Sequence, residues 1–451
     1  MPTAAFTTLG CKVNQYETQK ILESFEAQGF EIVPFDAPAD VYVINTCSVT
    51  QPAEAKSRQT VRRAARQNPN AIVVMTGCYA QFTIRRGETL QEAHLIVPNP
   101  DKLRTVEYLL EHFPHLRAQL AQARRNSETP IRRRTRAVLK IQDGCNVYCS
   151  FCSIPYTRPV MRSTLYTEVL QEARAMVEDG YRELVLTGVL IGDYGPDTGS
   201  GGPNLTELCA MLSEIEGLER IRISSIEPTL VSDELIELIA TNPKMCPQLH
   251  IPLQSGDSSV LQAMNRPYDQ AFYLDLIRRL RARIPNCGVS TDIMVGFPSE
   301  DEAAFQNTCF VAEQVEFCRA HLFRYSPRPD TPAESRGDQV PDSVKAERMQ
   351  RLQAVCKAAA RRYAARFLGA TERVLVEARS KLSGLMTGTS DHYLQVEFAA
   401  PPSMVGQLVS VRITDFTPDG VLGELMAHSG GMVSWSIKTH TVLASVPLQR
   451  G

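Results

Sequence analysis

Three cysteines lie within eight residues in the first half of the chain: Cys145, Cys149 and Cys152. Their spacing is C-x3-C-x2-C, and they closely follow a strand-like run at residues 138–141. Thiolates this close in sequence can surround one compact metal centre. A structural zinc ion normally takes four protein ligands, and no fourth Cys or His is nearby in the sequence. A [4Fe–4S] cluster held by three cysteines leaves one iron free to bind a small molecule, so we favour an iron–sulfur cluster over zinc.

A second set of cysteines is dispersed, but each member follows a strand-like run: Cys11, Cys47 and Cys78. The carboxyl ends of parallel strands share one edge of a sheet, so these thiols can converge there. Gly10 and Gly77 would let the backbone approach a bulky cluster, and a helix beginning near Gln51 would direct its positive end at it. The alternative is three core cysteines, because free Cys is commonly buried. The repeated position at strand ends favours a second cluster.

The composition indicates the kind of protein and the cellular compartment in which these thiols occur. Hydrophobic content of 43% and charged content of 22% describe an ordinary globular protein, and the net charge of -2 gives no general signal for nucleic acid. Neither a signal peptide nor an apolar run long enough to span a membrane is visible, so we expect a cytosolic protein. Disulfides are unusual there. The remaining cysteines are expected to be core residues: Cys209, Cys246, Cys287, Cys309, Cys318 and Cys356.

The hydrophobic pattern predicts three structural units, two of them α/β and the third all-β. Strand-like runs at 6–9, 41–44 and 72–75 alternate with helical stretches at 14–28 and 51–66, which predicts an open parallel sheet. Six further runs at 138–141, 184–186, 221–223, 249–251, 290–293 and 321–323, separated by helical patterns, predict a partial (β/α)6 barrel. After a long helix ending near Phe367 the period becomes two, which predicts a small β-barrel of about five strands.

The corresponding domain boundaries are 1–114 for the N-terminal cluster domain, 137–366 for the barrel and 367–430 for the small β-barrel. Residues 115–136 carry many arginines and a single acid, Glu128, and are predicted to be a basic linker. Residues 431–451 form a tail for which the sequence predicts no structure.

Both cysteine sets together resemble the radical S-adenosylmethionine methylthiotransferases, over nearly the whole chain. The C-x3-C-x2-C motif, with Phe151 before its third Cys, is the hallmark of the wider radical superfamily, and the small β-barrel resembles a TRAM domain. Residues 9–17, LGCKVNQYE, and 45–50, NTCSVT, look most like the MtaB-type tRNA branch. The chain differs from the family pattern at Leu190, where Asn is usual, and at Pro159, Ser299 and Asp330, where Gly is usual.

The resemblance implies two [4Fe–4S] clusters and two molecules of S-adenosylmethionine, one a methyl donor and the other a source of the 5′-deoxyadenosyl radical. The substrate would be N6-threonylcarbamoyladenosine next to the tRNA anticodon (position 37), which gains a methylthio group at C2. No catalytic residue beyond the six cysteines is predicted. Motifs at barrel strand ends are expected to bind the cofactor: Phe151, Thr187, Gly188, Ser225, Glu227, Gln254, Ser255 and Gly296. Any one of these motifs could instead be an ordinary capped turn.

Two basic clusters are candidates for tRNA contact. One lies on the helix after Cys47 (Lys56, Arg58, Arg62, Arg63 and Arg66), and the other is formed by Arg132, Arg133, Arg134 and Arg136. A solvated helix face and a linker are the alternative. An electron donor such as a flavodoxin or ferredoxin, and a sulfur donor, are further expected partners; a membrane is not. The rival functions are methylthiolation of a ribosomal protein or of isopentenyladenosine tRNA, and RNA binding with structural zinc.

Overall fold

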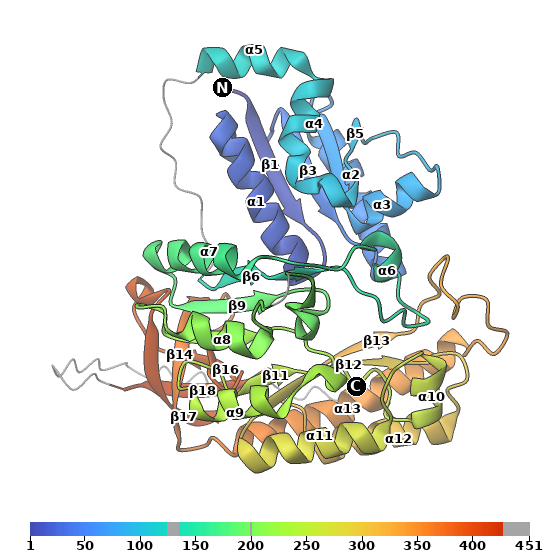
Figure 1. Ribbon diagram of the computed structural model, residues 1–451, viewed down its shortest axis with the longest axis vertical. Coiled ribbons are helices and arrows are strands. Elements are labelled where there is room, and N and C mark those ends of the chain that lie inside the picture. Colours follow the sequence, from blue (N-terminus) through green and yellow to red (C-terminus); the bar gives the residue numbers. More distant parts are fainter. Residues whose placement is uncertain (124–134, 199–200, 427–451) are drawn as a thin grey trace, which may run out of the picture.

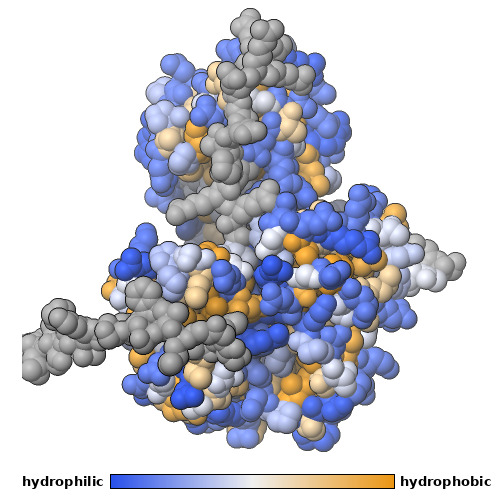
Figure 2. All heavy atoms as spheres, turned by 90° about the vertical axis from the view of Figure 1, so that its left-hand side faces the viewer, coloured by the Kyte–Doolittle hydropathy of each residue, from blue (hydrophilic) through white to orange (hydrophobic). Residues whose placement is uncertain are grey.

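The structure is a computed structural model that describes residues 1–123, 135–198 and 201–426. An N-terminal unit stands above a larger body, in which a half-open barrel lies beside a small closed one (Figure 1). The same two-part outline is visible from the side, and the face seen there is mainly hydrophilic with apolar side chains interspersed (Figure 2). The arginines at 132–134 and the tail at 431–451 lie outside the described residues.

The N-terminal unit is a five-stranded sheet in the order β2-β1-β3-β4-β5, and every neighbouring pair is parallel. Its strands are β1 (Thr3–Thr8), β2 (Glu31–Val33), β3 (Val41–Thr46), β4 (Ile72–Gly77) and β5 (Leu95–Ile96). The predicted open parallel sheet is therefore confirmed, with β2 and β5 as additional edge strands. In this order β1 connects to β2 on one side and β3 connects to β4 on the other, so the direction in which strands are added changes between β1 and β3. Open α/β sheets bind ligands at such a switch point.

Helices cover both faces of this sheet. Helices α1 (Lys12–Gln28), α4 (Thr105–His112) and α5 (Pro114–Ala123) pack on one face, and α2 (Gln51–Gln67) and α3 (Cys78–Arg85) pack on the other. Successive residues of β3 alternate between the two cores: Val41 and Val43 face the first, Tyr42 and Ile44 the second. Burial on both faces explains why these strands read as continuous apolar runs.

The central body contains six parallel strands in chain order. They are β6 (Ala137–Lys140), β9 (Glu183–Thr187), β10 (Arg220–Ile223), β11 (Gln248–His250), β12 (Gly288–Val295) and β13 (Arg319–Arg324). Backbone hydrogen bonds, including Ile226 N–H to His250 O at 2.9 Å, join the two three-stranded halves at β10 and β11. The predicted partial barrel of six units is confirmed, with β6 and β13 as its open edges.

Helices and short elements connect the barrel strands. The helices are α6 (Ile154–Thr157), α7 (Tyr166–Glu178), α8 (Leu205–Ser213), α9 (Asp233–Thr241), α10 (Ser258–Ala263), α11 (Gln270–Arg283) and α12 (Glu302–Val315). A short hairpin pairs β7 (Gln142–Asp143) with β8 (Arg162–Ser163) around the three-cysteine loop. The 3₁₀ turns are η1 (Asn99–Arg104), η2 (Ile191–Asp193), η3 (Pro196–Thr198) and η4 (Pro228–Leu230).

A long helix, α13 (Asp342–Ala365), leads to the closed C-terminal barrel, whose strand order is β14-β15-β16-β18-β17. The strands are β14 (Thr371–Arg379), β15 (Met386–Ser390), β16 (Gln395–Phe398), β17 (Leu408–Phe416) and β18 (Val421–Leu425), with η5 (Pro402–Met404) between β16 and β17. The predicted barrel of about five strands is confirmed. Arg220 at the start of β10 fixes it to the central body, because its guanidinium donates to Asp391 Oδ1 at 2.8 Å and to Thr389 O at 2.9 Å.

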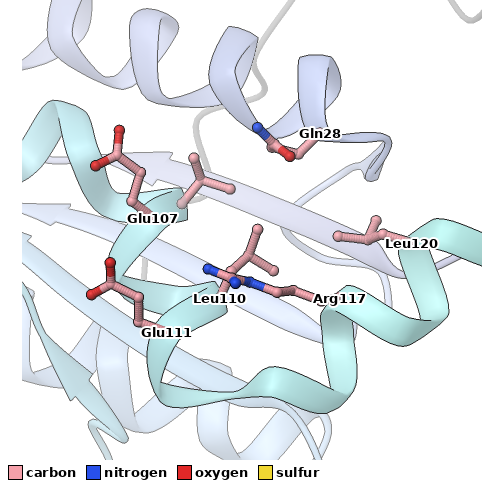
Figure 3. A pocket seen from close by; sticks show the side chains of 7 residues that line it. Gln28, Glu107, Leu110, Glu111, Arg117 and Leu120 are labelled. Atoms are coloured by element: carbon pink, nitrogen blue, oxygen red, sulfur yellow. The ribbon is translucent and has the colours of Figure 1, made fainter.

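The predicted basic linker begins as helix α5. Leu116 and Leu120 on this helix are buried in the core formed with α1 and α4. A pocket of about 380 Å³ lies between α1, α4 and α5, with Gln28 and Arg117 on its wall (Figure 3). Gln28 is the last residue of α1. A 17-residue helix is about 25 Å long, so this pocket is far from the cysteines at the other end of α1.

Candidate iron–sulfur and cofactor site

The three N-terminal cysteines lie together at the carboxyl edge of the parallel sheet. Cys11 follows β1 and caps α1, Cys47 follows β3, and Cys78 is the first residue of α3 directly after β4. Burial is the main cause that raises the pKa of Cys11 and of Cys47, and the negative charge of a Cys78 thiolate adds a smaller rise at both, as is expected for thiols at one sheet edge. The positive ends of helices α1 and α3 begin at this site, and that of α2 begins four residues after Cys47, which suits an anionic group.

Gly10 makes the close approach possible. Its φ is +96°, and a Cβ at this position would lie 2.7 Å from Cys47 Sγ. Cys47 and Cys78 are buried, whereas Cys11 is exposed, although desolvation by the surrounding protein raises the pKa of its thiol. Burial raises the pKa of Cys47 to about 12, and backbone hydrogen bonds from Asn14 and Val49 partly offset the rise at Cys11 and Cys47 respectively. Three thiols, backbone N–H donors and converging helix ends fit the ligand set of an iron–sulfur cluster.

The second set occupies the loop after β6 and β7, at the carboxyl end of the first barrel strand. Burial is the main cause that raises the pKa of Cys145 and of Cys152; charge repulsion from Cys149 adds to the rise at Cys145, and repulsion from Cys149 and Cys145 adds to the rise at Cys152. Arg266 donates from Nη1 to Cys149 Sγ at 3.0 Å, and the backbone N–H of Ile154 donates to Cys152 Sγ at 3.4 Å. Donors to the sulfurs are the interactions that tune an iron–sulfur cluster, so this loop also fits one.

Within the described ranges, no three His, Cys, Asp or Glu side chains converge as ligands of a single metal ion. In the same residues, no helix combines the length and apolar character that a membrane span requires. The six remaining cysteines are packed into the protein interior as expected: Cys209, Cys246, Cys287, Cys309 and Cys356 are buried, and Cys318 is half-buried against the C-terminal core.

The eight predicted cofactor contacts fall into two groups: six lie near the cysteine loop or the carboxyl ends of barrel strands, and two are engaged in packing and hydrogen bonds within the protein. Glu227 is tied to the cysteine loop through an ion pair with Arg266, the residue that donates to Cys149. Phe151 packs edge-on against Phe297 with ring centroids 6.3 Å apart. Thr187 and Ser225 lie at the carboxyl ends of β9 and β10, Gly188 packs on Gln142, and Gln254 has a φ of 62° beside β12.

The other group is engaged by the protein itself. Ser255 is completely buried, and its Oγ lies 3.4 Å from Thr308 Oγ1 on α12. The backbone N–H of Gly296 donates to Glu300 Oε1 at 2.8 Å, and a Cβ there would lie 2.3 Å from Lys345 Cγ. Local packing therefore accounts for Ser255 and Gly296 without a ligand.

A buried ionic network that sequence reasoning missed connects the two cysteine sets. Glu17 on α1 accepts from Lys102 at 2.6 Å and from Lys140 at 2.7 Å. Arg158, which follows the second cysteine loop, donates to Glu17 at 2.9 Å and to Asp143 at 2.6 Å. Burial opposes ionisation of Glu17, but the neighbouring cations outweigh it and hold its pKa well below the usual range. Glu17 thereby fixes the helix that starts after Cys11 against the segment that carries Cys145.

Residues 3–97 match a family described as "Uncharacterized protein family UPF0004", and residues 139–312 match the "Radical SAM superfamily". The fold is similar to that of a radical S-adenosylmethionine methyltransferase, TsrM from Kitasatospora setae, with a TM-score of 0.51, 13% identity and coverage of 74% and 75% of the two chains. Fold and sequence thus place the central body in the class of radical SAM proteins.

The chain is 39% identical to the threonylcarbamoyladenosine tRNA methylthiotransferase MtaB of Bacillus subtilis (strain 168), over 92% of this chain and 94% of the relative. The MtaB of Thermotoga maritima is 35% identical, with coverage of 94% and 96%. A tRNA-2-methylthio-N(6)-dimethylallyladenosine synthase of Carboxydothermus hydrogenoformans is 34% identical, with coverage of 92% and 98%. The chain belongs to the radical SAM tRNA methylthiotransferase family, which makes it a transferase and rules out the zinc-protein alternative.

Proposed function

We propose that this enzyme inserts a methylthio group at C2 of N6-threonylcarbamoyladenosine at position 37 of tRNA. The observation that supports this most strongly is the presence of two separate three-thiol sets, each at the carboxyl end of parallel strands, in a chain most similar, among the relatives given above, to an MtaB protein. Cys11, Cys47 and Cys78 would hold one [4Fe–4S] cluster, and Cys145, Cys149 and Cys152 the other.

The chemistry supplied at the second site would be one-electron cleavage of S-adenosylmethionine, which suits C2–H of an adenine because side-chain acids and bases do not activate it. This chain's residues orient and tune the site. Arg266 donates a charged hydrogen bond to Cys149, and Glu227 holds Arg266 in place through an ion pair. Glu17 fixes the N-terminal unit against the barrel through its ion pair with Arg158. An electron donor such as a flavodoxin or ferredoxin and a sulfur donor complete the reaction, which we place in the cytosol.

The tRNA is proposed to lie along helix α2. In the structure, some of the basic side chains predicted to contact tRNA are already paired with carboxylates. Arg62 pairs with Glu92 at 3.1 Å, and Arg63 pairs with Asp36. Lys56 and Arg66 form no ion pair with any described residue, so they are the cations on α2 best placed to neutralise phosphates. Arg58 stacks on Tyr79, its guanidinium 5.6 Å from the ring centroid.

The direct test is mass spectrometry of tRNA nucleosides from cells that lack this protein. We expect the methylthio-threonylcarbamoyl nucleoside to disappear and its unthiolated precursor to accumulate. Restoring the wild-type gene should reverse both changes, whereas a Cys149→Ala gene should not. Persistence of the methylthio-threonylcarbamoyl nucleoside would remove the proposal. Loss of only the methylthio-isopentenyl nucleoside, or of methylthio on a ribosomal protein, would select one of the alternative substrates.

A further inference from the structure

The loop that carries the second cysteine set presents an aromatic ring to solvent. Tyr148 lies between Cys145 and Cys149 in the sequence and is 53% exposed. Its backbone φ is +51°, in the left-handed region that residues other than glycine seldom adopt. Asn265 braces this conformation, because its side-chain amide donates to Val147 O at 3.2 Å and to Tyr148 O at 3.0 Å. The fold thus keeps a large ring out of the core at a conformational cost.

Two further residues complete a surface patch around this ring. The ring of Tyr156 lies edge-on to that of Tyr148, with centroids 6.3 Å apart. The Arg85 guanidinium lies over the ring of Tyr156, 5.4 Å from its centroid, and its Nη1 donates to Tyr156 O at 3.0 Å. Arg85 is exposed and forms no ion pair with any residue in the described ranges. We call Arg85, Tyr148 and Tyr156 the aromatic–arginine patch.

The aromatic–arginine patch is built from both units of the enzyme. Arg85 is the last residue of α3, the helix that begins at Cys78 of the first cysteine set, about 11 Å away along the helix axis. Tyr156 belongs to α6, which begins two residues after Cys152 of the second set. In Figure 1, α6 lies directly below α3, and the two helices are in contact. The patch therefore lies on the surface where the two cysteine-bearing units meet.

The location of the patch suits the nucleotides that flank the target adenosine. In the proposed function, one adenosine meets the radical chemistry of one cysteine set and the sulfur chemistry of the other. Its neighbours in the RNA must then lie on the surface around the junction of the two units. Anticodon-loop nucleotides are unpaired, and proteins bind such nucleotides by stacking aromatic rings on the bases and by neutralising phosphates with arginine. An exposed ring beside an exposed guanidinium without a carboxylate partner provides both groups.

We propose that Tyr148 stacks on an unpaired anticodon-loop base next to the target adenosine, and that Arg85 neutralises an adjacent phosphate. The inference rests on the proposed function and adds residues by which the enzyme holds the loop. Tyr156 is a positioning residue, because it contacts both the ring of Tyr148 and the guanidinium of Arg85. Every base has a face on which an aromatic ring can stack, so this contact contributes affinity for the loop rather than a sequence preference.

The experiment is equilibrium binding of an anticodon stem-loop RNA to the full-length, anaerobically reconstituted protein, followed by fluorescence anisotropy. A duplex RNA with the same number of phosphates is the second probe. Tyr148→Ala should weaken binding of the stem-loop by roughly 5- to 150-fold, the strength of one base–aromatic stack, and leave binding of the duplex unchanged. Tyr148→Phe keeps the ring and should bind the stem-loop within about 2-fold of wild type. The iron content of each variant is measured first, which separates loss of a stack from damage to the cysteine loop.

Arg85→Gln should give a different signature. Loss of one phosphate contact should reduce the slope of log affinity against log salt concentration by about 0.7 for a single strand, whereas Tyr148→Ala should leave that slope unchanged. Phe310→Ala is the matched control for the ring, because Phe310 is an exposed aromatic residue on α12. Arg174→Gln is the control for the charge: Arg174 is exposed on α7, and α7 and α6 lie on opposite sides of the molecule in Figure 1. Both controls should bind the stem-loop as wild type does.

Unchanged stem-loop affinity in Tyr148→Ala, or equal losses for the stem-loop and the duplex, would overturn the inference. If Tyr148→Ala loses iron, the exposed Arg85 decides the matter, and an unchanged salt slope in Arg85→Gln would overturn it. Slower reduction of the second cluster by an electron-carrier protein, with RNA affinity unchanged, would assign the patch to that partner instead. None of these readouts depends on turnover. Failure of the proposed function would appear separately, as persistent methylthio-threonylcarbamoyl nucleoside in cells lacking the protein.

Discussion

Arg158 Nη2 lies 2.9 Å from Glu17 Oε2, and the two residues are 141 positions apart in the chain. Glu17 belongs to the helix that starts after Cys11, and Arg158 follows the loop that contains Cys152. The pair is almost completely buried, with side-chain exposures of 4% and 2%. This buried ion pair, together with the pair between Lys140 and Glu17, therefore helps to fix the position of one thiol set relative to the other.

Replacing Glu17 with Gln should destabilise the protein by about 3–5 kcal/mol, because Lys102, Lys140 and Arg158 would lose their shared buried partner. Urea denaturation measures the free energy of unfolding. Glu23→Gln is the matched control on the same helix: its pair with Lys20 is exposed, so it should cost less than about 1 kcal/mol. Equal losses for the two variants would contradict a structural role for the network.

Gly10→Ala should remove the N-terminal cluster and lower the iron content of reconstituted protein by about half. The added Cβ would collide with Cys47 Sγ, and a φ of +96° costs a non-glycine residue a further ~1–2 kcal/mol. Gly87→Ala is the control, because Gly87 also has a positive φ but no atom lies within 4 Å of its Cβ position. Full iron content in Gly10→Ala would contradict the requirement for a glycine beside Cys47.

Arg266→Gln should make the reduction potential of the second cluster more negative. The guanidinium that donates to Cys149 Sγ stabilises added electron density, and its loss also leaves Glu227 without its cation. A redox titration monitored by electron paramagnetic resonance checks this in protein lacking the three N-terminal cysteines. Arg278→Gln removes an exposed arginine and serves as the reference. A potential that does not move would exclude Arg266 from tuning the cluster.

Glu183 should make stability depend on pH. Burial opposes its ionisation, but Arg222 and Arg220 outweigh burial and lower its pKa to about 2. An unfolded glutamate titrates near ~4.3, so the contribution of about 3 kcal/mol is complete above that pH and is lost as the pH falls toward the folded value. The stability difference between wild type and Glu183→Gln should therefore narrow as the pH falls from about 5 to about 3.

Glu219→Gln provides the comparison for this pH series, since Glu219 forms only an exposed pair with Arg182 at 3.7 Å. The free energy of unfolding of Glu219→Gln should differ little from that of the wild type at every pH in the series. A stability difference for Glu183→Gln that is independent of pH would show that Glu183 is not ionised in the folded protein.

The strands that position the cysteines were predictable because they are buried on both faces and therefore apolar throughout. Edge strands β2 and β5 were missed, since three residues and two residues are too short to give a periodic signal. Strand β15, MTGTS, lacks the apolar alternation of its neighbours. Helix α5 was predicted to be part of a linker because its surroundings are rich in arginine, although Leu116 and Leu120 have helical spacing and are both buried.

Two departures from the family pattern have a structural counterpart. Ser299 and Asp330 stand where Gly is usual, and both adopt a positive φ, 75° and 70°. The backbone geometry is therefore kept at some conformational cost without the glycine. Glu17, Arg158 and Arg266, by contrast, could not be assigned from the sequence, because each has a partner more than a hundred residues away that only the fold brings close.

The most direct test of the two-cluster site is the iron content of anaerobically reconstituted protein in three forms. Wild type should contain about eight irons per chain, and each triple alanine variant, of Cys11, Cys47 and Cys78 or of Cys145, Cys149 and Cys152, about four. Cys287→Ala, which removes a buried core thiol, should retain the wild-type amount. About four irons in the wild type, unchanged when Cys11, Cys47 and Cys78 are replaced, would contradict the N-terminal cluster.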